Sequence, residues 1–123
     1  MKTLVELSSE QFCVADPNSL FTASRFREIV DARKVCMFIL RKYTLASLDQ
    51  IGGYFNRDHA TALHSIRATK VHYKNEKLFR ERVDKIMDEV RSGNIELPFT
   101  IVSFDRGVEY NIYEECYCNL QAS

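Results

Sequence analysis

The stretch that most constrains this chain covers residues 47–67, SLDQIGGYFNRDHATALHSIR. It predicts a short helix, a tight turn and a second helix. Ser47 with Gln50 forms a capping box that would start the first helix, and Asp58 is a good N-cap for the second. The glycine pair at 52–53 would let another backbone approach closely. This order of parts indicates a helix-turn-helix, in which the start of the second helix meets base edges in the major groove of DNA.

The octet RDHATALH at residues 57–64 resembles the signature of the C-terminal DNA-binding domain of the bacterial replication initiator DnaA, which is close to GGRDHTTVLHA. Residues 27–52 resemble the segment leading into that signature, and the resemblance covers roughly residues 24–90. Two differences stand out. The turn at 55–57 reads Phe-Asn-Arg, one residue shorter than the usual Phe-Gly-Gly-Arg, and Ala60 replaces a usual threonine.

The resemblance implies a mainly α fold, a Trp-repressor-like helix-turn-helix bundle. We expect this domain at residues 22–92, after an N-terminal extension at 1–21 that could hold a short strand or a short helix. Residues 93–123 would carry a β-hairpin appendage and an acidic tail, because two β-prone segments flank the turn DRG. An isolated hairpin is marginal in water. We therefore expect it to pack on the helices, pair with residues 3–7, or bind a second copy or a protein partner.

Besides the short helix that Ser47 would start, three helices are expected in the domain, over residues 32–43, 59–73 and 76–91. The last would be capped by Asn75, carry Leu78 on its inner face and stop at Gly93. His64 would be a half-buried structural histidine. His59 and His64 are five residues apart and so lie on different helix faces, which argues against a metal site.

Net charge is zero over the 123 residues, but the charge is unevenly distributed. Residues 22–92 hold 15 basic and 9 acidic residues, a balance of +6, whereas residues 1–21 carry −2 and residues 93–123 carry −4. The positive charge therefore coincides with the helix-turn-helix, where attraction to phosphates would need it. The acidic tail could weaken DNA binding or compete with DNA for the basic face.

The resemblance implies that the target resembles the A·T-containing DnaA box. Asp58 would accept a hydrogen bond from a cytosine amino group. His59 and Ala60 would contact thymine methyls or other base edges. Arg33 matches the arginine that the family sends into the minor groove, where a long cation senses A·T-rich shape. The expected phosphate contacts are Arg25, Arg27, Lys34, Arg57, Thr61, Arg67 and Lys70.

The composition argues against other functions. None of the four glycines precedes a lysine, so the phosphate loop of an ATPase is missing and no nucleotide is expected. No catalytic constellation is evident, and we expect neither an enzyme nor a cofactor. No apolar run is long enough to span a membrane. The four cysteines are expected to be reduced thiols in a cytoplasmic protein.

The sequence thus predicts a stand-alone, sequence-specific double-stranded DNA-binding domain that controls replication or transcription. The alternative is a DnaA-like protein-interaction module in which DNA binding is weak or lost. The shorter turn, Ala60 and the acidic tail motivate this alternative.

Overall fold

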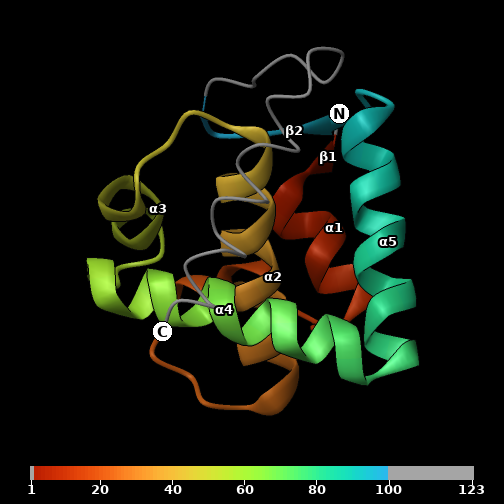
Figure 1. The fold of residues 1–123 in the computed structure, drawn as a ribbon, viewed down its shortest axis with the longest axis horizontal. Coiled ribbons are helices and arrows are strands. Elements are labelled where there is room, and N and C mark those ends of the chain that lie inside the picture. Colours follow the sequence, from red (N-terminus) through yellow and green to blue (C-terminus); the bar gives the residue numbers. More distant parts are fainter. Residues whose placement is uncertain (1, 100–123) are drawn as a thin grey trace.

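The computed structural model describes residues 2–99, and helices form most of this part of the chain (Figure 1). The mainly α architecture predicted from the sequence is confirmed. No helix within residues 2–99 has the length and apolar character needed to cross a membrane. The elements are, in order, β1 (Lys2–Thr3), α1 (Leu4–Gln11), the 3-10 helix η1 (Pro17–Phe21), α2 (Arg27–Tyr43), α3 (Leu48–Tyr54), α4 (His59–Asn75), α5 (Lys77–Arg91) and β2 (Ile95–Glu96).

Helix α2 is the central element, and the other helices pack around it (Figure 1). Val35, Cys36 and Ile39 are fully buried within it. It begins at Arg27, five residues before the predicted start, since nothing in residues 27–31 breaks a helix. Helix α4 crosses α2 near the middle of α2, while α3 packs on the first part of α4 and α5 on its last part. This arrangement leaves the two ends of α4 in different surroundings.

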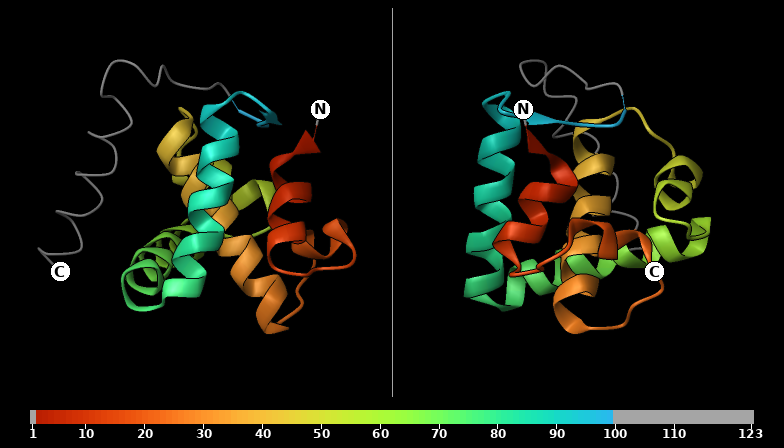
Figure 2. Two further views of the ribbon diagram at one scale, coloured as in Figure 1. Left: turned by 90° about the vertical axis from the view of Figure 1, so that its right-hand side faces the viewer. Right: turned by 180° about the vertical axis from the view of Figure 1, so that it is seen from behind.

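Helix α1 belongs to the same core rather than to an extension. Thr3 caps it in a capping box with Glu6, in which the Glu6 amide donates to the Thr3 hydroxyl at 3.2 Å. The buried side of α1 packs on α2 and α5, as the view from behind shows (Figure 2). Strand β1 pairs in parallel with β2, Lys2 opposite Ile95. A boundary at residue 22 therefore separates no structural unit.

The junction of α4 and α5 differs from the prediction. Asn75 is the last residue of α4, and Glu76 takes the N-cap position of α5 without a side-chain cap. The helical ladder continues past Asn75, because the Glu76 amide donates to the His72 carbonyl at 3.0 Å. Leu78 is 55% exposed, and its neighbour Phe79 is buried instead. The predicted β-hairpin and acidic tail lie outside the described residues.

Candidate nucleic-acid interface

The helix-turn-helix is formed by α3, the turn at residues 55–58 and α4. The helix caps predicted from the sequence at Ser47 and Asp58 are both present. Ser47 caps α3: its hydroxyl accepts from the Gln50 amide at 3.2 Å, and the Gln50 side chain accepts from the Ser47 amide at 2.8 Å. Both halves of the predicted capping box are present. Ile51 and Phe55 are fully buried and fix α3 on the core.

The turn depends on one glycine and one asparagine. A Cβ on Gly52 would lie 2.7 Å from the Asp58 carbonyl oxygen, so only glycine fits. A Cβ on Gly53 would meet nothing within 4 Å, so the close approach involves one glycine rather than the predicted pair. Asn56 adopts a left-handed conformation with φ of 59°, which asparagine tolerates better than most residues. A turn shorter than the usual Phe-Gly-Gly-Arg thus closes without a glycine at residue 56.

The start of α4 is exposed and held firmly. Asp58 caps the helix, its Oδ1 accepting from the Thr61 amide at 2.8 Å. These hydrogen bonds lower the pKa of the Asp58 carboxyl, which is therefore ionised at neutral pH. Asp58, His59 and Ala60 are all exposed, and Thr61 is half-buried. The predicted base-reading residues therefore share one accessible helix start.

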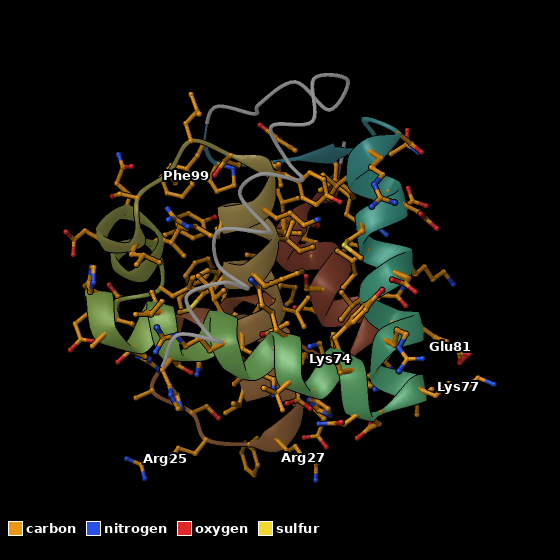
Figure 3. The ribbon with its side chains drawn as sticks, in the orientation of Figure 1. Arg25, Arg27, Lys74, Lys77, Glu81 and Phe99 are labelled. Carbon is orange, nitrogen blue, oxygen red and sulfur yellow. The ribbon has the colours of Figure 1, made fainter. Side chains whose placement is uncertain are left out.

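A second segment, the basic loop (residues 22–27), is fastened to the helix-turn-helix. The Arg57 guanidinium donates to the Thr22 carbonyl at 2.9 Å, and the Asn56 amide donates to the Phe21 carbonyl at 3.2 Å. Arg25 and Arg27 are exposed on this loop and project from the lower edge of the molecule (Figure 3). Hydrogen bonds from the turn therefore fix the beginning of this loop to the helix-turn-helix, and its two exposed cations follow at Arg25 and at Arg27, whose Nε lies 3.9 Å from an Asp31 oxygen.

Asn56 was not among the predicted site residues. Its role is indirect, since it holds the basic loop rather than reaching outward. The left-handed backbone position that it occupies is a local signal that a sequence can carry. The carbonyl that accepts from Asn56 lies 35 residues earlier in the chain, and no local sequence signal indicates that it is the partner.

Arg33 requires a correction, because its side chain points inward. It is 7% exposed, and its guanidinium donates to the carbonyls of Leu20 at 2.8 Å, Thr22 at 2.9 Å and Ser24 at 3.3 Å. Burial, together with the nearby Arg57 charge, lowers the pKa of Arg33. A guanidinium held in this way would give up three hydrogen bonds to reach a base. Arg33 is thus an anchor of the basic loop and not an exposed base contact.

Two predicted phosphate contacts are also engaged within the protein, Lys70 buried and Lys34 half-buried. Lys70 is 4% exposed. The Lys34 ammonium lies 3.1 Å from Nδ1 of His72 and 3.4 Å from an oxygen of Asp31, far along α4 from its start. The sequence predicts that Lys34 lies off the apolar stripe of its helix, but it does not show that His72 of α4 and Phe79 of α5 pack against it.

Two further predictions concern α4. Arg67 is half-buried, and its Nε has no hydrogen-bond partner within the part of the chain that the structure describes. His64 is exposed, contrary to the expectation of a half-buried structural residue. Residues 2–99 contain no group of three or more side chains suited to hold a metal ion.

Comparisons with known proteins agree with this geometry. The family model described as the bacterial dnaA protein helix-turn-helix matches residues 3–68. This chain belongs to that family. The matched region includes α1, in accord with its place in the core, and makes α3, the turn and α4 a DNA-binding helix-turn-helix.

Individual relatives carry the same family name. The chromosomal replication initiator protein DnaA of Synechococcus sp. (strain JA-2-3B'a(2-13)) is 34% identical over 89 residues, which are 72% of this chain and 19% of that protein. The protein of the same name from Bacteroides thetaiotaomicron is 36% identical over 72 residues, 58% of this chain and 15% of its own length. That from Desulfatibacillum aliphaticivorans is 38% identical over 74 residues, 60% of this chain and 16% of its own length. The chain therefore spans less than a fifth of each of these relatives.

Proposed function

We propose that this protein binds double-stranded DNA at a DnaA-box-like site, with the start of α4 in the major groove. The observation that carries the proposal is the exposed, capped start of α4 beside a basic loop fixed to the turn. A capped helix start is pre-organised, so little ordering is needed on binding. Arg25 and Arg27, which are exposed on this loop, would contact the phosphates that border the groove.

The proposed base contacts are Asp58, His59 and Ala60. A carboxylate among phosphates is unfavourable unless it accepts from a base, and the cytosine amino group is the donor that the major groove offers. Asp58 uses Oδ1 for its cap, which leaves its second oxygen for such a donor. We assign phosphate contacts to Arg25, Arg27, Arg57, Thr61 and Arg67, and none to the buried Arg33 and Lys70 or to the half-buried Lys34.

The biological setting that we propose is control of DNA replication, since the relatives are chromosomal replication initiators. A role in transcription control would use the same DNA contacts. In either setting the DNA site is recognised by this helix-turn-helix.

The test is a fluorescence anisotropy titration of a DnaA-box duplex and a scrambled duplex at several salt concentrations. We expect tighter binding to the box, and a salt dependence whose slope falls by about one for each phosphate contact removed. Equal affinity for the two duplexes would contradict site-specific binding and favour a protein-interaction module instead.

Asp58→Asn sharpens this test because asparagine keeps a helix cap and removes the charge. We expect a lower ratio of specific to non-specific affinity, with non-specific binding equal or slightly tighter. Asp88→Asn on the exposed surface of α5 is the matched control for loss of one negative charge. Unchanged discrimination at the cytosine position in Asp58→Asn would make Asp58 a cap alone.

A further inference from the structure

Phe26 is the most exposed of the large apolar side chains in the described chain, at 73%. It lies between the exposed Arg25 and Arg27 at the tip of the basic loop. It also occupies the N-cap position of α2, where it makes no side-chain cap hydrogen bond.

Phe26 goes against two local preferences at once. Helix N-caps favour short polar residues, and Thr3, Ser47 and Asp58 follow this rule in the same chain. An aromatic ring in water also forgoes the gain of burial. Residues that break local rules without a structural return are expected at functional sites.

The backbone that carries Phe26 is firmly held. The Arg33 guanidinium donates hydrogen bonds to the carbonyls of Leu20, Thr22 and Ser24. Arg57, in the turn of the helix-turn-helix, donates to the Thr22 carbonyl as well. The ring therefore stands on a loop whose position relative to the start of α4 is set by hydrogen bonds.

The surroundings favour DNA as the partner of this ring. Two exposed cations flank Phe26, which suits a densely charged polyanion. The next most exposed large apolar side chain, Leu45 at 67%, lies beyond the other end of α2, about 25 Å away along a helix of 17 residues. A single ring flanked by two arginines is a poor core for a protein interface, which needs a contiguous apolar patch.

We propose that Phe26 is an apolar wedge that enters the minor groove beside the base pairs facing α4 and partly unstacks one base step there. This inference rests on the proposed function and adds deformation of the DNA to it. With α4 in the major groove, the loop fastened to the turn lies over the bordering phosphates, and the next opening is the minor groove. That groove, about 6 Å wide, admits single side chains rather than a helix. Apolar wedges of this kind kink the duplex, and Arg25 and Arg27 would hold the flanking phosphates.

The experiment uses the full chain and a box duplex with 2-aminopurine at steps flanking the site and fluorophores at its ends. We expect the wild type to raise 2-aminopurine fluorescence and bring the duplex ends closer together. Phe26→Ser should abolish both changes and weaken binding to the box by about tenfold. Serine is a better N-cap, so the melting temperature should be equal or higher. Leu45→Ser is the matched control and should change none of these readouts.

Phe26→Trp provides an independent signal because the chain contains no tryptophan. Its emission should be quenched on binding as the indole stacks against bases. The wedge is overturned if Phe26→Ser binds and bends the duplex like the wild type, or if Phe26→Trp stays unquenched. It is also overturned if Phe26→Ser changes the solution mass but not DNA binding, since Phe26 would then contact a second copy.

Failure of the proposed function gives a different result, namely equal wild-type affinity for box and scrambled duplexes. The wedge is then tested by the 2-aminopurine fluorescence of the scrambled duplex with wild type and with Phe26→Ser. Unstacking that depends on Phe26 upholds it, and unstacking that does not, or none, overturns it.

Discussion

The two ends of α4 carry the same residue type in opposite situations. At its start, the His59 side chain is 57% exposed, and its Nδ1 lies 3.6 Å from an Asp49 oxygen. At its other end, His72 is 16% exposed and stacks on Phe79 with 3.6 Å between ring centroids. Its Nδ1 accepts from the Lys34 ammonium at 3.1 Å. One end is available to an outside partner, and the other is already satisfied within the protein.

The same contrast holds for the carboxylates at the two ends. The pKa of Asp58 is lowered by its hydrogen bonds to Thr61, a local feature of the helix start. The pKa of Glu76 is lowered by its hydrogen bond with His72, whose Nε2 lies 3.0 Å from the Glu76 carboxylate. Because an ammonium can only donate, His72 carries its proton on Nε2 and donates it to Glu76. At the end of α4, which we call the satisfied end, Lys34, His72 and Glu76 form a hydrogen-bond network. At the start of α4, the available end, Asp58 makes only a local cap.

The largest effect is expected from Phe79→Ala at the satisfied end. Phe79 is 2% exposed and packs against Phe12, with ring centroids 5.6 Å apart. Loss of its ring should lower the free energy of unfolding by about 3–5 kcal/mol in urea denaturation. Phe26→Ala, which removes an exposed ring, is the control and should change it by less than about 0.5 kcal/mol. Similar losses in the two variants would mean that the satisfied end does not contribute to the core.

The turn before α4 offers a matched pair of glycines. Gly52→Ala should lower the free energy of unfolding by about 1–3 kcal/mol, since its Cβ would lie 2.7 Å from the Asp58 carbonyl oxygen and 2.8 Å from that of Arg57. Gly53→Ala meets open space inside a helix and should raise it by about 0.5–1 kcal/mol. Thermal or urea unfolding of both variants checks this. Equal effects would show that the two backbones do not approach at Gly52.

Substitution of the two histidines tests which end of α4 is available to DNA. His72→Ala should lower the free energy of unfolding by about 1–2 kcal/mol, because it removes one of the two acceptors of the Lys34 ammonium and the ring that stacks on Phe79, and should leave DNA affinity of the folded protein unchanged. His59→Ala should change stability by less than about 0.5 kcal/mol. It should weaken binding to a DnaA-box duplex about fivefold to tenfold. Urea denaturation and anisotropy titration separate the two effects, and an exchange of these outcomes would reverse the comparison.

The smallest effect is expected from pH. The Asp58 carboxyl has a folded pKa below its ordinary value of 3.8, so its contribution to stability is fully present above that value. The contribution is lost as pH falls through the lower folded pKa. Above about pH 5, the melting temperatures of wild type and Asp58→Asn should therefore differ by a constant amount. Below about pH 4 the wild type should lose the contribution of the Asp58 carboxylate, so its melting temperature should fall relative to that of the variant. A difference that changes between pH 5 and 8 would require another titrating group.

Local sequence was sufficient for the parts of this protein that depend on neighbouring residues. The capping box at Ser47, the cap at Asp58 and the close approach at Gly52 were predicted because caps and tight turns involve residues three to six positions apart. The exposed helix start followed from them, and so did the helix-turn-helix. Residues 3–7 were predicted as a possible strand and residues 9–15 as a possible helix, whereas α1 spans Leu4–Gln11 and is part of the core.

The direction of the long cations was decided only by the tertiary structure. Arg33, Lys34 and Lys70 looked like surface cations, yet Arg33 and Lys70 are buried, and Lys34 is half-buried against His72 of α4 and Phe79 of α5. Helical periodicity places a side chain on a face, but it does not say which distant segment packs against that face. A long aliphatic stem also lets a cation turn inward when backbone carbonyls from elsewhere in the chain receive it. Those carbonyls, such as that of Thr22, are brought to Arg33 by the fold and by nothing in the local sequence.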